Sequence, residues 1–283
     1  MKRIFTFTFL GVGTRELGVS EPASDPLYAQ HAGDRATIFH DEHDIDTARL
    51  GQLAGRVGKA LMDIVLGTIL AVVAVPVIAA LAVILAIRLG QWPFFWHRRI
   101  GQYGKPITFP KLRTLPKATP RYALKDGGAV IPVDRFTAFL RHRHLDELPQ
   151  LLLVPLLKMS LVGPRPKMPD RFEPTDPGYR DARQLVRQGC TGLWQIGHES
   201  HYLVHERPEY DFCYLQYGSL RMDLWILWRT ALLMVGGKTI RLSTVPRWVL
   251  GAGWVNEGRI RAVGGARFLI SSDRLASGRR PAA

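Results

Sequence analysis

A run of 24 residues without a charged side chain, Ile64 to Ile87, constrains this chain more than any other feature. At a rise of about 1.5 Å per residue, such a helix is long enough to cross a hydrocarbon core of about 30 Å. The run has no polar face, which argues against a buried helix of a soluble protein. Pro76 lies near its middle and predicts a kink, because proline removes a helical hydrogen bond.

Basic residues flank the run on both sides: Arg56 and Lys59 before it, and Arg88, Arg98 and Arg99 after it. Positive side chains favour the cytoplasmic face of a membrane. A helix that enters the bilayer, bends at Pro76 and returns to the same face satisfies both flanks. The sequence therefore predicts a re-entrant, proline-kinked helix, with an ordinary single-pass anchor as the alternative.

The 283 residues carry a formal net charge of +14, which implies an anionic partner. Nucleic acid, anionic lipid and a phosphorylated substrate all fit this charge. Basic residues beside apolar segments and tryptophans favour anionic membrane lipids. No zinc-finger, RNA-binding or basic-zipper pattern is present in the sequence, so no nucleic-acid partner is expected. The two cysteines, Cys190 and Cys213, are too few for a disulfide framework and favour a reducing compartment.

The chain divides into a polar extension (1–53), a membrane-inserted helix with basic flanks (54–93), a domain (94–245) and a basic tail (246–283) that we expect to be disordered. Phe94 to Ile100 and Pro106 to Thr114 flank a glycine-containing turn and predict a β-hairpin. Ser219 to Val235 predicts a helix in the bilayer interface, with a core helix as the alternative. The expected fold is α+β, mainly helical with a small β-hairpin, and membrane-associated through the re-entrant helix and interfacial amphipathic helices.

Asp146 and Glu147 are adjacent carboxylates in a basic setting, preceded by Arg141, His142, Arg143 and His144. Adjacent acidic residues usually form only a solvated surface. Here Pro149 biases Leu148 away from helix and places the pair near an element boundary, where side chains converge on ligands. A basic cluster keeps a carboxylate ionised and attracts an anionic substrate. Together with the apolar run, the motif indicates phosphate chemistry at a membrane surface.

Several segments resemble, in the same order, those of the bacterial sugar transferases, the monotopic polyprenyl-phosphate phosphoglycosyl transferases that begin surface glycan synthesis. The segments are Arg98-Arg99-Ile100-Gly101, Lys111-Leu112-Arg113-Thr114, Leu145 to Gln150, Met159 to Pro166, Gly189 to Gln195 and Tyr210 to Tyr214. The resemblance covers roughly Arg56 to Gly236. The shared order is more specific than any single motif.

The resemblance implies transfer of a sugar 1-phosphate from a nucleotide diphosphate sugar, with a UDP-sugar favoured, to a polyprenyl phosphate. Nucleoside monophosphate is released. Asp146 matches the catalytic nucleophile, which would form a covalent aspartyl-phosphosugar intermediate, and Glu147 matches a catalytic carboxylate that binds or orients Mg²⁺. An acyl phosphate splits one difficult displacement into two easier ones. Mg²⁺ held by few protein ligands and several phosphate oxygens would neutralise the diphosphate.

Arg165 is the first candidate for a substrate contact, because its planar fork suits phosphate oxygens and the flanking prolines stiffen its loop. A surface arginine is the alternative. The other candidate substrate contacts are basic or amide side chains in or near the matching segments: Lys111, Arg113, Arg141, Arg187 and Gln195.

The resemblance further implies a bacterial inner-membrane protein whose catalytic domain (94–245) faces the cytoplasm, acting in exopolysaccharide, capsule or O-antigen initiation. Downstream glycosyltransferases are further candidate partners, and the sequence predicts no particular oligomeric state. Departures from the usual family pattern occur at Leu153, Lys158, Gln188 and His198. The alternative is a catalytically silent homologue that binds polyprenyl phosphate or a glycan-assembly partner. Retention of two adjacent carboxylates favours the enzyme.

Overall fold

The computed structural model describes residues 47–116, 134–168, 175–200 and 207–271. Its α-helices are α2 (Thr47–Leu89), α3 (Arg135–His142), α4 (Pro177–Arg183), α5 (Pro208–Tyr217), α6 (Leu220–Met234) and α7 (Glu257–Ala262). The strands are β1 (Phe94–Ile100), β2 (Pro106–Leu112), β3 (Ser160–Val162) and β4 (Gly189–Thr191). The 3₁₀ helices are η2 (Gln102–Gly104), η3 (Leu145–Leu153), η5 (Leu242–Thr244), η6 (Arg247–Val249) and η7 (Ala266–Phe268). The described part is thus mostly helical with two small sheets.

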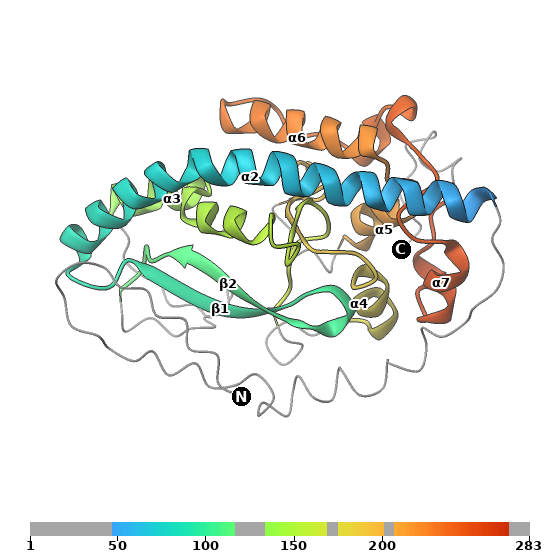
Figure 1. Ribbon diagram of the computed structural model, residues 1–283, viewed down its shortest axis with the longest axis horizontal. Helices are drawn as coiled ribbons and strands as arrows, with labels where there is room; N and C mark the ends of the chain where they lie inside the picture. The colour runs from blue at the N-terminus through green and yellow to red at the C-terminus, as the bar shows by residue number, and fades with distance from the viewer. Residues whose placement is uncertain (1–46, 117–133, 169–174, 201–206, 272–283) are drawn as a thin grey trace.

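Helix α2 runs along the length of the molecule above the β1–β2 hairpin (Figure 1). Ala74, Ile78, Ala82 and Leu85 recur every three or four residues, so they form one stripe, which packs on β2, α3 and η3. The opposite stripe is exposed and apolar, and includes Val65, Ile69, Val72, Val73, Val83 and Ile87. Burial of one stripe and exposure of the other fix how α2 lies on the domain.

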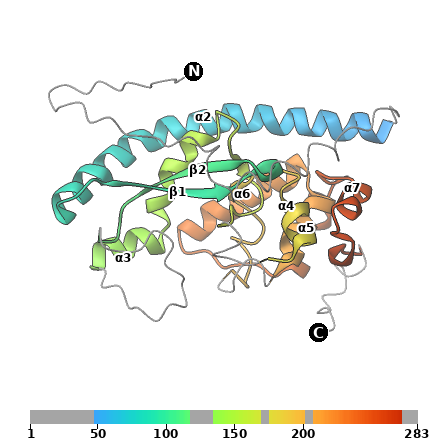
Figure 2. The same ribbon diagram turned by 90° about the horizontal axis from the view of Figure 1, so that it is seen from below.

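Within the described residues, α2 is the one helix long and apolar enough to cross a membrane. It is a single helix of 43 residues with Pro76 inside it. Figure 2 shows α2 along one edge of the fold, with the β1–β2 hairpin and the other helices on one side of it. A re-entrant path and a kink at Pro76 stay predictions.

The predicted hairpin is present. Strands β1 and β2 pair antiparallel, with Phe94 opposite Leu112 and Ile100 opposite Pro106. The turn passes through η2, where Tyr103 has φ 55° and Gly104 has φ 74°. Glycine adopts this left-handed conformation without steric cost, which suits it to the turn. The hairpin carries Lys111 near the end of β2, on the side of the domain that holds η3.

A second sheet, not expected from the sequence, pairs β3 and β4 in parallel, with Ser160 opposite Gly189 and Val162 opposite Thr191. All three residues of β3 are buried. Around this sheet lies the larger core, with α5 buried on most of its surface: Tyr210, Phe212, Cys213, Tyr214 and Leu215. A helix that is buried all round belongs to the centre of a fold, so α5 is its central element.

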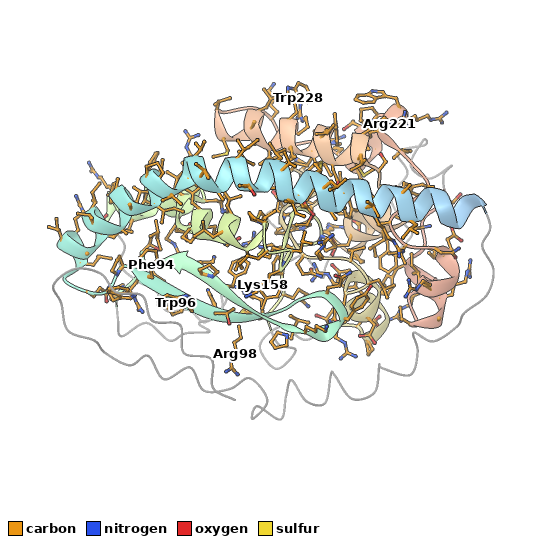
Figure 3. All side chains as sticks on the ribbon, viewed as in Figure 1. Phe94, Trp96, Arg98, Lys158, Arg221 and Trp228 are labelled. Atoms are coloured by element: carbon orange, nitrogen blue, oxygen red, sulfur yellow. The ribbon has the colours of Figure 1, made fainter. Side chains whose placement is uncertain are left out.

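Helix α6 has an inner face of Met222, Trp225 and Ile226, all buried. Its outer face exposes Leu224 and Trp228, and Figure 3 shows Trp228 and Arg221 pointing away from the rest of the fold. The helix therefore packs on the core and also presents apolar and basic side chains outward. Its placement in a bilayer interface stays a prediction.

The segment after Pro246 differs from the disordered tail expected from its Gly- and Arg-rich composition. As far as Ser271 it folds back onto the core through η6, α7 and η7. Val249, Trp254 and Ile260 are buried in the main cluster. These apolar residues are widely spaced and follow no helical or strand period, so the sequence around them gives no sign that they are buried. Their burial in the core offsets the conformational entropy lost when this segment becomes ordered.

Candidate active site

The two adjacent carboxylates begin η3, directly after a break in the chain direction. Helix α3 ends at His142, and His144 has the left-handed conformation with φ 54°. Asp146 and Glu147 then occupy the first turn of η3. An element boundary therefore lies near the pair, but it falls at Arg143 and His144. The expectation that Pro149 makes this boundary is wrong, because Leu148 and Pro149 lie inside η3.

Glu147 is held by two cations from distant parts of the chain. Lys111 Nζ lies 2.5 Å from Glu147 Oε1, and Arg165 Nη2 lies 3.2 Å from the same oxygen. Burial works to raise the pKa of Glu147, but Arg165 and Lys111 outweigh it and hold the pKa well below its usual range. Glu147 is therefore ionised, and it fixes both cations at one point.

Asp146 lies next to this ion cluster, and its own backbone N–H donates to its carboxylate. The side chain is buried, with 7% exposure of the residue. In the described part of the chain, no other residue donates a hydrogen bond to it or forms an ion pair with it. Burial raises the pKa of Asp146 to about 6 with the help of Glu147, against the opposing charges of Lys111 and Arg141. At neutral pH Asp146 is mostly ionised and retains free lone pairs.

Arg165 is presented by a loop that is anchored on both sides. The loop Gly163 to Pro166 follows β3 directly, and Gly163 N donates to Thr191 O of β4 at 2.9 Å. Arg183 Nη2 donates to the carbonyl of Arg165 at 2.7 Å. Arg183 itself is buried and paired with Asp211, Nε to Oδ2 at 2.9 Å. The backbone that carries Arg165 is thus fixed from α4 and α5 as well as from β3.

The other sequence-predicted contacts divide into two groups. Arg141 Nη1 donates to Thr114 Oγ1 at 3.4 Å and is near enough to lower the pKa of Asp146. Arg113 instead places its guanidinium over the ring of Phe95, 5.1 Å from the centroid. No described contact joins Arg113 to the carboxylates, so the structure does not bring it into this cluster.

Arg187 and Gln195 lie on the β4 side of the Arg165 loop. A Cβ added to Gly163 would sit 2.5 Å from the carbonyl oxygen of Arg187, so the two backbones are in close contact. Gln195 Oε1 lies beside Gly192, which packs against the carbonyl of Gly163. Both amide atoms of Gln195 are buried without a hydrogen-bond partner in the described residues. Roles for these two side chains in substrate binding stay predictions.

Two departures from the family pattern also have defined surroundings. Gln188 is buried, and its amide donates to the carbonyls of Arg183 and Val186 at 3.2 Å each. His198 is exposed, with Nδ1 3.3 Å from Thr239 Oγ1. Neither departure interrupts the contacts among Lys111, Glu147 and Arg165.

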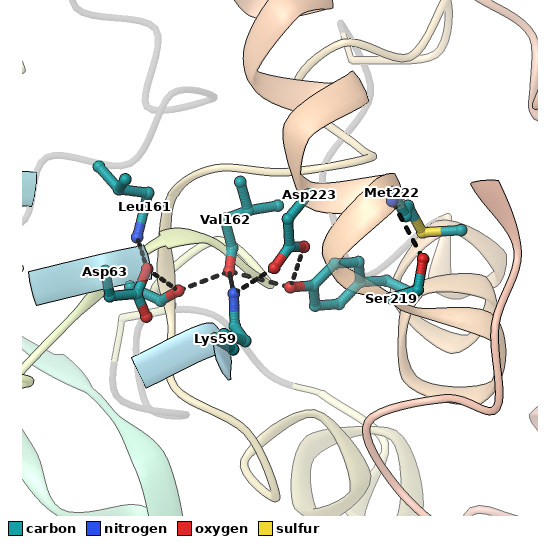
Figure 4. A network of polar contacts seen from close by, with 9 residues as sticks. Lys59, Asp63, Leu161, Val162, Ser219, Met222 and Asp223 are labelled. Carbon is teal, nitrogen blue, oxygen red and sulfur yellow. Dashed lines mark hydrogen bonds and ion pairs between the residues drawn. The ribbon is translucent and has the colours of Figure 1, made fainter. Parts of the chain in front are cut away.

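A buried polar network was missed from the sequence. It joins Lys59 and Asp63 of α2 to the backbone of β3 and to Asp223 of α6 (Figure 4). The spacing of Lys59 and Asp63, four residues apart at the edge of the uncharged run, places both on one helix face. That spacing is the signal that could have indicated a buried partner.

The residues fit a divalent cation only if the substrate completes its coordination. No group of three or more His, Cys, Asp or Glu side chains suited to a metal exists among the described residues. Asp146 and the second oxygen of Glu147, Oε2, are the available carboxylate oxygens, since Oε1 binds Lys111 and Arg165. Mg²⁺ commonly uses one or two carboxylates together with phosphate oxygens, so this pair is adequate for it.

Comparison with known proteins shows which family the sequence resembles. Residues 54–237, more than half of the chain, match the family described as bacterial sugar transferase. An uncharacterized sugar transferase of Haemophilus influenzae is 32% identical over 201 residues, which cover 64% of this chain and 41% of that protein. The exopolysaccharide production protein ExoY of Sinorhizobium fredii is 30% identical over 192 residues, or 62% of this chain and 84% of that protein.

A third relative, from Caulobacter vibrioides, is named UDP-glucose:undecaprenyl-phosphate glucose-1-phosphate transferase. It is 33% identical over 196 residues, which cover 64% of this chain and 71% of the relative. The region that matches the family, residues 54–237, thus contains α2 from Ala54 onward, both sheets and helices α3 to α6, and ends before the C-terminal segment that packs on the core.

Proposed function

The chain belongs to the bacterial sugar transferase family, and from this premise we propose that it transfers a sugar 1-phosphate from a nucleotide diphosphate sugar to a polyprenyl phosphate. Nucleoside monophosphate is the second product. The names of the relatives support a UDP-sugar donor, an undecaprenyl phosphate acceptor and a place in exopolysaccharide synthesis. Capsule or O-antigen initiation would use the same chemistry.

One observation carries the proposal: the two adjacent carboxylates differ in their ion pairing. Glu147 is committed to Lys111 and Arg165, whereas Asp146 is buried, mostly ionised at neutral pH and forms no ion pair within the described residues. A carboxylate poised in this way beside two cations is suited to attack an anionic phosphorus centre, because the cations neutralise the approaching phosphate. A purely structural acidic pair would engage both carboxylates.

The proposed reaction has two displacements. An oxygen of Asp146 attacks the phosphorus that bears the sugar, and the bond from that phosphorus to the bridging oxygen breaks, so nucleoside monophosphate leaves with the electron pair. The product is an acyl phosphate between Asp146 and the sugar phosphate. A phosphate oxygen of the polyprenyl phosphate then attacks the same phosphorus, which releases the carboxylate of Asp146 and forms the lipid diphosphate sugar.

Lys111 and Arg165 would bind the diphosphate oxygens, and Glu147 would keep both cations in position between turnovers. Arg165 has a planar fork that can engage two phosphate oxygens, while Lys111 acts as a point charge. Bound Mg²⁺, held by Asp146, Glu147 Oε2 and the diphosphate, would neutralise negative charge on the transferring and leaving groups.

The proposed setting is the cytoplasmic face of the bacterial inner membrane, with the exposed apolar stripe of α2 among lipid chains. The acceptor is a membrane lipid, so a site beside a membrane-inserted helix can reach its phosphate. The net charge of +14 favours anionic headgroups around the domain. Downstream glycosyltransferases would take the lipid-linked product.

The decisive test incubates the purified full-length chain in nanodiscs with a panel of nucleotide sugars, with and without polyprenyl phosphate. We expect release of nucleoside monophosphate with one class of donor. With donor alone, intact mass should show a sugar-phosphate adduct, and peptide mapping should place it on Asp146. Turnover without an adduct would favour direct transfer. Binding of polyprenyl phosphate without turnover for any donor would favour the catalytically silent homologue.

A further inference from the structure

The first buried turns of α2 are bonded directly to the strand that precedes the Arg165 loop. Asp63 Oδ1 accepts hydrogen bonds from Leu161 N at 3.0 Å and from Ser160 Oγ at 2.9 Å. Lys59 Nζ donates to the carbonyl of Val162 at 3.0 Å. Figure 4 shows these contacts in one cluster between α2 and the β3 backbone. Two side chains of one helix face thus bind all three residues of β3.

A second set of bonds fixes the same carbonyl from the other side. Tyr214 Oη lies 3.0 Å from Val162 O and 2.8 Å from Asp223 Oδ1, so its single O–H is shared between these two acceptors. Asp223 Oδ2 accepts from Lys59 Nζ at 2.7 Å. Lys59, Tyr214 and Asp223 are all buried. The last residue of β3 is therefore held by helices α2, α5 and α6 together.

Val162 and Arg165 are separated by only Gly163 and Pro164. The prolines on either side of Arg165 restrict how far the loop can compensate for a shift of the strand. We propose that Asp63, assisted by Lys59, is a positioning residue that sets the place of the Arg165 guanidinium through β3. The inference rests on the proposed function for its kinetic consequence, because Arg165 is there assigned to the substrate phosphates.

A purely stabilising role explains this network less well. A buried charged pair contributes little net stability, and apolar residues of similar volume often serve as well or better. Asp63 is fully buried, and its Oδ2 has no hydrogen-bond partner among the described residues, which carries a desolvation cost. The hydrogen bonds to Asp63 Oδ1 fix the register between α2 and β3, which an apolar side chain could not do.

The test compares Asp63→Ala with Asp63→Asn. The amide oxygen of the Asn variant can still accept from Leu161 N and Ser160 Oγ, so we expect kcat/KM for the nucleotide sugar to stay within about threefold of the unsubstituted enzyme. The Ala variant should lose about tenfold or more. Equal losses in both variants would overturn the positioning role and indicate a role for the charge.

A double-mutant cycle asks whether Asp63 acts through Arg165. In the Arg165→Lys background the fork geometry is already lost, so adding Asp63→Ala should cost less than about threefold. The full loss in that background would refute the inference. Gln216→Ala is the matched control, because Gln216 also joins a buried helix to a distant backbone, accepting from Ile270 N at 2.7 Å, but does not touch β3. It should leave kcat/KM within about twofold.

Hydrogen exchange supplies a readout that does not need turnover. The Gly163 amide donates to Thr191 O and the Gly189 amide donates to Pro164 O, so both report on the loop rather than on the bonds of Asp63 itself. In the full-length chain, Asp63→Ala should speed exchange of these amides at least tenfold, whereas Asp63→Asn and Gln216→Ala should not. Unchanged exchange in the Ala variant would disprove positioning. Faster exchange without activity for any donor would refute the proposed function alone.

Discussion

Asp146 and Glu147 are neighbours in the chain, yet their carboxylates have opposite surroundings. Lys111 and Arg165 reach Glu147 from β2 and from the loop after β3, whereas Asp146 is shielded from water without a bonded cation. Pairs of titratable groups with separated pKa values commonly mark different chemical roles. Under the proposed function, this separation suits Asp146 to attack and Glu147 to charge placement.

The raised pKa of Asp146 predicts a stability gain on neutralisation. The pKa of its carboxyl rises from 3.8 to about 6 on folding, so the ionised carboxylate costs more free energy in the folded state than in the unfolded state. Asp146→Asn should therefore stabilise the fold by about 3 kcal/mol near pH 7.5, since a tenfold change in an ionisation constant corresponds to ~1.4 kcal/mol. The gain should disappear as the pH falls from 6 to about 4, because the carboxyl becomes protonated in the folded and then in the unfolded state. Thermal unfolding of the Asn variant and of the unsubstituted protein across this pH range tests the prediction. A stability difference that does not change with pH would contradict it.

The same group predicts an acid limb in the rate profile. Only ionised Asp146 can attack, so kcat/KM should fall about tenfold per pH unit below pH 6. Glu147→Gln should move this limb to lower pH, because Glu147 raises the pKa of Asp146 while Lys111 lowers it. A limb that stays in place in the Gln variant would assign the titration to another group.

Arg165→Lys tests the fork directly. Lysine keeps the charge but offers no planar pair of donors, so we expect kcat/KM for the nucleotide sugar to fall about tenfold or more. The loss should concern use of the nucleotide sugar, and KM for polyprenyl phosphate should change little. Unchanged kinetics with both substrates would make Arg165 a surface residue.

The sequence predicted the residues around the carboxylate pair better than it predicted the buried network that anchors β3. Ordered motifs pointed to Asp146, Glu147, Lys111 and Arg165, and the structure brings all four together. The role of Asp223 could not be predicted from the sequence, because an acidic residue in a helix gives no information about which distant side chain it contacts. Its pairing with Lys59 exists only in the folded chain.

Among the elements, those with local signals were predicted and those made by tertiary packing were not. The β1–β2 hairpin has alternating residues and a short glycine turn, so pairing is encoded within a few residues. Strands β3 and β4 have three residues each and pair in parallel across a long connection. Three residues give too little periodicity to recognise.

Helix α2 passes close to the domain at Gly67. A Cβ there would lie 2.6 Å from Val154 Cγ1, so Gly67→Ala must displace η3 or the helix even though alanine favours helices. We expect a loss of about 1–3 kcal/mol, as for other overpacked sites. Gly55→Ala is the control, because its Cβ would meet only Trp254 at 3.7 Å, and it should be neutral or stabilising by up to about 1 kcal/mol. If both substitutions change the thermal unfolding temperature equally, the structure around Gly67 accommodates the added methyl group without cost.

For the whole molecule, the two ends of α2 contact the same folded domain. Near the start, Arg56 Nη2 donates to Trp254 O at 2.9 Å. Beyond the end, Gln91 Nε2 donates to Leu115 O at 3.0 Å. The buried stripe of α2 packs on the domain between these points. A polar domain lies on one side of a bilayer, so a straight span would have to break the contacts at one end.

Both flanks of the Ile64 to Ile87 run should therefore face the cytoplasm. Single cysteines at Val57 and Trp92, which are 51% and 62% exposed, report on the two flanks. In intact cells neither should react with a membrane-impermeant maleimide, and both should react after permeabilisation, relative to the unsubstituted chain with Cys190 and Cys213. Reaction at one flank alone in intact cells would establish a straight span. Pro76→Leu should favour that span by restoring a continuous helical ladder, at the expense of the contacts that Arg56 or Gln91 makes with the domain.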